Sequence, residues 1–170
     1  ISKLNPGKMV VLDKAETPLH GITLELQQSR PKDGLFPVLM DLRNKKCLTS
    51  LFDQFKFDII FHAAAYKHVP ILEHFPGEAV TNNVVATKNL VDIAKKAGTG
   101  AFILVSTDKV VNPTNVMGVS KRICEMYIQE LNKESRCKYI TVRFGNVLES
   151  NGSVVPLFKR QILEGGPVTV

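Results

Sequence analysis

The chain has 170 residues, of which 44% are apolar and 22% charged, and its formal net charge is +6. This composition is typical of a globular domain with one hydrophobic core. No apolar run reaches the roughly 20 residues that a membrane helix needs, and the three cysteines lack the CxxC spacing of a metal or redox site. The positive charge indicates either an anionic partner or merely surplus surface lysines. Basic stripes with interleaved aromatics are absent, which argues against nucleic acid.

Three elements are expected near the start: a strand over residues 9–12, a helix over 21–28 and a strand over 36–40. Asp13 follows the first strand, where an acid accepts hydrogen bonds from the ribose hydroxyls of a dinucleotide and repels a 2′-phosphate. This favours NAD over NADP, the alternative being a solvated turn residue. Asp41 and Leu42 follow the next strand, and Asp41 lies too far from the helix expected over 48–55 to cap it directly.

A strand over residues 58–62 leads into Ala63, Ala64 and Ala65. Their small side chains let a cofactor approach the backbone closely. Lys67 and His68 follow on a loop. Such a pair is usually only surface, but at the carboxyl end of a central strand it is well placed to meet a phosphate or a sugar.

A helix is then expected over residues 80–97, with Asn83 near its start and Gly98 at its end. Near the other end of the chain, a strand over 139–144 carries Arg143 and is followed by Asn146. Both residues are candidates to bind a diphosphate. A helix over 154–163 completes the described pattern, and no His, Cys or Asp cluster has the spacing of a metal site.

The chain is organised around the stretch FILVSTDKVVNPTNVMGVSK, residues 102–121. Its apolar start predicts a buried strand over 102–105, and a helix is expected over 118–131. Thr107, Asp108 and Lys109 directly follow the strand, where ligands bind in open α/β sheets. Lys121 joins them from the helix. A hydroxyl, an acid and two amines are therefore expected in one crevice.

The alternation of strands and helices, without repeats or linkers, predicts an α/β fold with a doubly wound parallel sheet of the Rossmann type. No G-x-G-x-x-G occurs in the sequence. We therefore expect residues 1–170 to be one partial NAD-binding domain of a longer protein, whose first strand and glycine-rich phosphate loop lie upstream. Such a fragment is expected to be inactive and to bind NAD weakly or not at all.

Thr-Asp-Lys at 107–109, together with Asn-Val-Met-Gly-x-x-Lys at 115–121, resembles the nucleotide-sugar 4,6-dehydratases of capsular polysaccharide biosynthesis, within the short-chain dehydrogenase/reductase superfamily. FHAAAYKHVPILE, VRFGNVL and GSVVPLFKRQI match as well, so the resemblance covers nearly the whole chain. It implies NAD-dependent dehydration of a UDP-linked N-acetylhexosamine, with UDP-N-acetylglucosamine as the expected substrate. It also implies a cytoplasmic domain and a homo-oligomeric parent, which in many relatives is membrane-anchored.

The resemblance assigns roles to the residues of the crevice. Met117 stands where the superfamily has its catalytic tyrosine, and a thioether cannot accept the proton. We expect Thr107 to relay the C4 hydroxyl proton to Asp108. Asp108, held partly neutral by an apolar site, then protonates the C6 hydroxyl. Lys109, made less basic by burial and by the charge of Lys121, removes the C5 proton.

Four residues take cofactor roles from the resemblance. Lys121 holds the nicotinamide ribose, and Asp41 and Leu42 contact the adenine. Asn83 braces the catalytic lysine through backbone and water, the alternative being an ordinary polar helix residue. Two other functions stay open. A nucleotide-sugar 4-epimerase needs C4 oxidation without elimination, but normally uses the tyrosine that is missing here. The second is a cofactor-binding module without turnover. It is suggested by Met117 in the place of the catalytic tyrosine, and Thr-Asp-Lys would then be only a polar turn.

Overall fold

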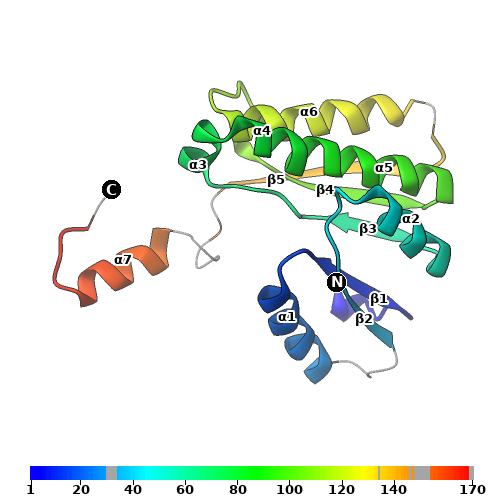
Figure 1. The fold of residues 1–170 in the computed structure, drawn as a ribbon, viewed down its shortest axis with the longest axis horizontal. Coiled ribbons are helices and arrows are strands. Elements are labelled where there is room, and N and C mark those ends of the chain that lie inside the picture. Colours follow the sequence, from blue (N-terminus) through cyan, green and yellow to red (C-terminus); the bar gives the residue numbers. More distant parts are fainter. Residues whose placement is uncertain (30–33, 134, 146, 148–153, 169–170) are drawn as a thin grey trace.

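The computed structural model of the chain describes residues 1–29, 34–133, 135–145, 147 and 154–168. Strands and helices alternate along it (Figure 1). In chain order the described elements are η1 (Ser2–Leu4), β1 (Met9–Asp13), α1 (Glu16–Ser29), β2 (Leu35–Leu39), α2 (Lys45–Gln54), β3 (Ile59–His62), α3 (Val69–His74), α4 (Pro76–Glu78), η3 (Ala79–Val85), α5 (Ala86–Ala97), β4 (Ala101–Thr107), η4 (Asp108–Val110), α6 (Val116–Leu131), β5 (Lys138–Phe144) and α7 (Val154–Leu163). This order confirms the predicted α/β class.

The described strands form two parallel sheets. β1 pairs with β2, and β4 lies between β3 and β5. β1 and β3 do not pair with each other, so the described strands form two separate parallel sheets and not one continuous sheet.

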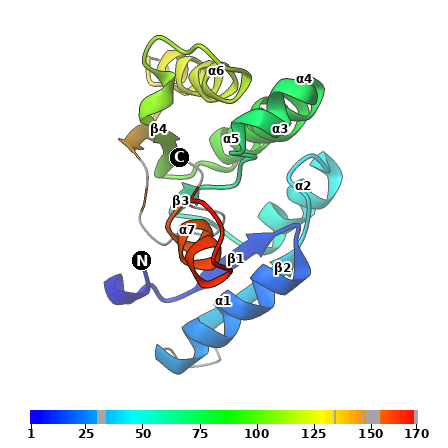
Figure 2. The ribbon, with the colours of Figure 1, turned by 90° about the vertical axis from the view of Figure 1, so that its left-hand side faces the viewer.

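Helices lie on opposite sides of the strands. α5 and α6 cover the β3–β4–β5 sheet on one side, and α1 packs on β1 and β2 on the other side of the molecule (Figures 1 and 2). The main core lies between β4 and the helices α2, α5 and α6. Phe102 and Leu104 of β4 are fully buried there, with Leu48 and Val91. Alternate residues of β4 face the core, as the period-2 pattern of a strand requires.

Several elements differ from their predicted bounds by one to three residues, among them α2, β4 and α6, and two differ more. α1 begins at Glu16 and not at residue 21, because Asp13 accepts the Ala15 N–H and Pro18 is tolerated in a first helical turn. The helix expected over 80–97 is divided into a π-helical segment, η3, and α5. It ends as predicted at Gly98, which has the positive φ of 75° that glycine adopts without strain. Within the described part of the chain, no helix is both long and apolar enough to cross a bilayer.

Candidate active site

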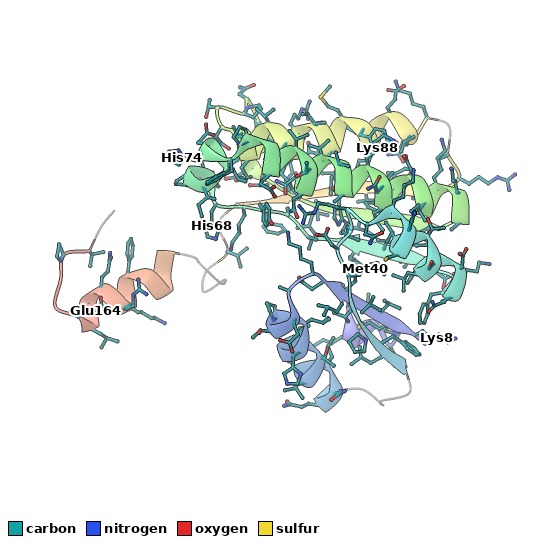
Figure 3. All side chains as sticks on the ribbon, in the orientation of Figure 1. Lys8, Met40, His68, His74, Lys88 and Glu164 are labelled. Atoms are coloured by element: carbon teal, nitrogen blue, oxygen red, sulfur yellow. The ribbon has the colours of Figure 1, made fainter. Side chains whose placement is uncertain are left out.

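The carboxyl ends of β1, β2 and β3 border a pocket of about 240 Å³. Its lining consists of Leu12, Asp13, Lys14, Met40, Asp41, Leu42, Ala63, Ala64, Ala65, Tyr66, Asn82 and Ala86. Six of the residues predicted to bind the cofactor thus share one pocket, namely Asp13, Asp41, Leu42, Ala63, Ala64 and Ala65. Met40, labelled in Figure 3, lies where the chain passes from β2 toward α2. The parallel strands bring these side chains together because their carboxyl ends meet at one edge.

The two acids of this pocket are engaged differently. Oδ1 of Asp13 accepts the Ala15 N–H at 2.8 Å, and Oδ2 makes no hydrogen bond to the described residues. The carboxylate of Asp41 accepts the N–H, Nε and Nη2 groups of Arg43 at 2.9, 2.9 and 2.6 Å. The side-chain hydrogen bond from Arg43 holds the pKa of Asp41 below its ordinary value. Asp13 therefore has the freer oxygen for a ribose hydroxyl. As predicted, Asp41 does not cap α2, whose cap is Asn44.

Sequence reasoning missed a polar bridge across the pocket. The ammonium of Lys14 donates to the Tyr66 hydroxyl at 2.5 Å and to Oδ1 of Asn82 at 2.7 Å. It also lies 4.0 Å from the centre of the Tyr66 ring, a cation–π distance. The one available signal was position, because Lys14 directly follows Asp13 at the strand end. The bridge joins the loop after β1 to the loop after β3 and to η3.

The side chain of Asn83 bonds to the loop after β3 and to α6. It is 1% exposed, and its side-chain amide pairs with both backbone groups of Tyr66, at 2.8 Å to N and 3.1 Å to O. It also donates to Oγ of Ser120 at 3.0 Å. No direct contact to Lys121 is among these bonds. Asn83 therefore braces the loop after β3 and ties it to the residue that precedes Lys121.

The second group of predicted residues lies at the end of β4. Thr107 donates its hydroxyl to Oδ1 of Asp108 at 2.9 Å, and the ammonium of Lys109 lies 3.2 Å from the same oxygen. The side chains of Asp108 and Lys109 are 58% and 37% exposed. Hydrogen bonds from Thr107 and Lys109 hold the pKa of Asp108 below its ordinary value.

These facts correct two expectations. The site around Asp108 is not apolar, so Asp108 is an ionised carboxylate and not a partly neutral acid. Lys109 is ion-paired and more than a third exposed, so the burial that was expected to make it less basic is absent. The reason is the η4 turn, which begins at Asp108 and carries both side chains off the end of the sheet.

The η4 turn nevertheless lies directly on α6. A Cβ added to Gly118 would be 2.4 Å from the Lys109 carbonyl oxygen, which no real contact permits. Gly118 follows Met117, so Lys109 stands on the first turn of the helix that carries Lys121. Asn115 caps this helix by accepting the Gly118 N–H at 2.8 Å. The predicted strand-end and helix residues therefore meet through backbone contact.

Met117 and Lys121 both face inward from α6. Met117 is 5% exposed and packs with Leu72 and Ala79, so in this structure it is a core residue. Lys121 is 7% exposed, and its ammonium donates to the Val105 carbonyl at 2.7 Å. Burial lowers the pKa of Lys121 from its ordinary value.

The residues predicted to bind substrate are less closely gathered. Lys67 and His68 are exposed on the loop before α3, at whose amino end Figure 3 labels His68. Arg143 is committed to Glu125, with Nε 2.9 Å from Oε1 and Nη2 2.5 Å from Oε2. Asn146 lies outside the described residues. Among the described residues, no three His, Cys, Asp or Glu side chains are grouped as metal ligands.

A family model described as polysaccharide biosynthesis protein matches residues 1–170. The chain belongs to the polysaccharide biosynthesis protein family. Over 172 residues, this family member is 47% identical to the capsular polysaccharide biosynthesis protein CapD of Staphylococcus aureus. The match covers 100% of the chain and 29% of CapD. Over 153 residues, it is 38% identical to a UDP-glucose 4-epimerase of Rickettsia canadensis. This match covers 86% of the chain and 43% of the epimerase. The chain thus spans less than half of either relative.

Two solved structures show the same fold. The X-ray structure of Pen from Bacillus thuringiensis matches the family member with a TM-score of 0.84 and 31% identity, over 94% of the chain and 49% of Pen. DesIV, a dTDP-glucose 4,6-dehydratase of Streptomyces venezuelae with NAD and TYD bound, matches with a TM-score of 0.78 and 23% identity, over 95% of the chain and 54% of DesIV. At 23% identity the second match supports the fold alone.

Proposed function

We propose that this chain is part of an NAD-dependent nucleotide-sugar 4,6-dehydratase that acts on a UDP-linked N-acetylhexosamine, with UDP-N-acetylglucosamine as the first substrate to test. One observation carries the proposal. Thr107, Asp108 and Lys109 form a hydrogen-bonded acid–amine pair at the end of β4, against a helix with Met117 in the place of the usual tyrosine. Elimination of water across C5 and C6 needs an acid for the leaving hydroxyl and a separate base for the C5 proton, whereas oxidation and reduction at one carbon need only a single group that takes and returns the hydroxyl proton.

The pocket at the ends of β1, β2 and β3 supports NAD as the cofactor. Leu12, Met40 and Leu42 offer apolar surface to an adenine ring, and Oδ2 of Asp13 is available to a ribose hydroxyl. The three alanines allow close approach of the backbone. Bound there, NAD would take up a hydride from C4 of the sugar and return it at C6. DesIV, which shares the fold, was solved with NAD.

The ionised state of Asp108 sets the order of proton transfers in the proposal. Asp108 first takes the C4 hydroxyl proton through Thr107, and so becomes the acid that protonates the C6 hydroxyl as water leaves. Its neutralisation also removes the ion-pair partner of Lys109. In the proposed step Lys109, after giving one proton to solvent, removes the C5 proton, returns it to C5 and takes a proton back from solvent. Asp108 ends as a carboxylate and Lys109 as an ammonium, so the protons balance.

Lys121 has a binding role in this scheme. Its ammonium is held by the Val105 carbonyl on one side. Its burial next to the end of β4 suits contact with the nicotinamide ribose. Lys67, His68, Arg143 and Asn146 are proposed to bind the UDP-sugar.

A 4-epimerase is the second candidate, and the 38% identity to the Rickettsia canadensis epimerase favours it. An epimerase would not need Asp108 and Lys109 together, and it normally uses the tyrosine that Met117 replaces. Incubating the full-length protein with UDP-N-acetylglucosamine and NAD decides between the two. A 4-keto-6-deoxy sugar nucleotide in the NMR spectrum supports dehydration, and a 4-epimer as the sole product refutes it.

A further inference from the structure

Glu125 of α6 is the most completely buried charged side chain among the described residues, with an exposed fraction of 0%. A buried carboxylate is costly unless it is paired and hydrogen-bonded. Both of its oxygens are occupied. Arg143 binds them as a two-pronged fork, and Nη1 of Arg122 lies 3.2 Å from Oε2. Burial alone would raise the pKa of Glu125, but the hydrogen bonds from Arg143 and Arg122 outweigh it and hold the pKa below the ordinary value.

The carboxylate joins α6 to β5 at the end of the sheet where the candidate site lies. Glu125 is one helical turn after Lys121, so the two side chains share a helix face. Arg143 comes from β5, where it is in register with Ser106 of β4. Two residues beyond Arg143, a Cβ on Gly145 would lie 3.5 Å from Oδ2 of Asp108. Glu125 therefore sits beneath the same strand ends that carry the acid–amine pair.

The fork also fixes what Arg143 can present to a ligand. Because Nε and Nη2 are both bound to one carboxylate, the plane of the guanidinium is set. Nη1 makes no hydrogen bond to the described residues, and the side chain is 39% exposed. The Nε–Nη2 edge of the Arg143 guanidinium is thus held in place, while Nη1 stays accessible.

We propose that Glu125 is a positioning residue for the sugar nucleotide: it orients Arg143 so that Nη1 meets an oxygen of the diphosphate. This inference rests on the proposed function, since it needs a diphosphate substrate. It adds a residue that the sequence pattern did not single out. The competing explanation is an ion pair that only stabilises the domain, and the two differ in what a charge-neutral substitution does to substrate affinity.

The test is Glu125→Gln in the full-length protein, with steady-state kinetics and with calorimetry of UDP binding. Glutamine keeps the shape but turns an NH₂ group toward arginine donors, so Arg143 loses its fixed plane. We expect KM for UDP-N-acetylglucosamine to rise about tenfold while kcat changes less than about threefold. The matched control is Glu130→Gln on the same helix, because Glu130 pairs with Lys133 at 2.7 Å in full solvent exposure and such pairs contribute little.

Arg143→Lys provides the second arm. Lysine cannot form the fork, so it should raise KM about as much as Glu125→Gln, and the double variant should add little to either single change. The proposal would be overturned if the KM increases of the two single changes multiplied in the double variant. It would also be overturned if Glu125→Gln had the same KM as Glu130→Gln. If Glu125→Gln does not fold, Glu125→Asp keeps the charge but withdraws the carboxylate by one methylene, and an unchanged KM then overturns it.

The UDP-binding measurement separates this proposal from the proposed function. If the wild-type protein binds UDP but does not turn the sugar nucleotide over, the dehydratase proposal fails. A loss of about tenfold in UDP affinity for Glu125→Gln, absent in Glu130→Gln, would still support the positioning role. Equal UDP affinity in both variants refutes it.

Discussion

At Asp108, solvent and two donors decide a protonation state that the sequence could not reveal. A strand end followed by Thr-Asp-Lys places an acid beside the crevice, but whether that acid is neutral depends on its exposure. The side chain is 58% exposed and is hydrogen-bonded by Thr107 and Lys109. In the proposed reaction Asp108 would therefore begin as a base and would gain its acidic proton from the substrate.

This state predicts the pH dependence of the reaction. Hydrogen bonds from Thr107 and Lys109 hold the pKa of Asp108 below its ordinary value, so the carboxylate form persists through neutral and mildly acidic pH. The kcat/KM profile of the full-length protein should show no acidic limb from this group between about pH 5 and 8. Asp108→Asn should lower kcat/KM by about 10²- to 10⁴-fold at every pH in that range. An acidic limb near neutrality that disappears in Asp108→Asn would contradict this.

His62 makes a second prediction at the residue scale. Burial, aided by the charge of Lys121, lowers its pKa from 6.5 to about 3. Below pH 6.5, His62 therefore binds a proton in the unfolded chain but stays neutral in the folded chain. The free energy of unfolding falls as the pH drops toward about 3. Between pH 6.5 and 5 this one group removes about 2 kcal/mol of unfolding free energy.

The variant His62→Gln should therefore lose less stability than wild type between pH 7 and pH 5, by about 2 kcal/mol. Urea unfolding at the two pH values gives the difference, whatever the substitution costs at pH 7. His20→Gln is the control, because His20 is exposed on α1. An equal loss in His62→Gln and wild type would show that His62 is not the sensitive group.

Among the elements, α6 shows most directly which features of the candidate site can be predicted from the sequence. Its lysine could be placed from the sequence, but its start could not: the helix was expected from residue 118 and begins at Val116, capped by Asn115. Nor could the need for glycine at 118 be predicted, because it arises from the Lys109 carbonyl of another element, 2.4 Å from the position of a Cβ. The contact fixes η4 on the helix.

Gly118→Ala should therefore destabilise the domain by about 1 to 3 kcal/mol, as overpacking does, and should reduce turnover by displacing Lys109. Gly21→Ala on α1 is the matched control, since nothing lies within 4 Å of its Cβ position. There the usual helix preference should stabilise by about 0.5 to 1 kcal/mol. Thermal unfolding compares the two, and a Gly118→Ala protein as stable as Gly21→Ala would refute the close contact.

η3 illustrates what spacing cannot predict. The spacing of the apolar residues of 80–97 fits a continuous α-helix. The π-helical turns depend instead on hydrogen bonds, one of them from another helix. The Asn83 carbonyl is bonded by Oγ1 of Thr87 at 2.5 Å and by Sγ of Cys124 at 3.2 Å, the latter from α6. The same turns place the Asn83 amide on Tyr66. The role of Asn83 as a brace was thus foreseeable in kind, but not in its partner.

For the molecule as a whole, the parallel α/β architecture and the gathering of polar residues at one edge followed from the alternating pattern. Asp13, Asp41 and the alanines meet in one pocket because the carboxyl ends of parallel strands lie at the same edge. Long-range ion pairing was not predicted. Arg143 was expected, with Asn146, to bind a diphosphate, and its fork with Glu125 depends on a helix residue 18 positions away. Such long-range pairs leave no mark in local spacing.

The central claim is that the hydride removed from C4 returns at C6 after water has left. UDP-N-acetylglucosamine carrying deuterium at C4 tests it most directly, with the full-length protein, NAD and detection by NMR. The account predicts deuterium in the C6 methyl group of a 4-keto-6-deoxy product. Deuterium that remains at C4 of a UDP-sugar, with the C6 hydroxyl intact, would contradict it.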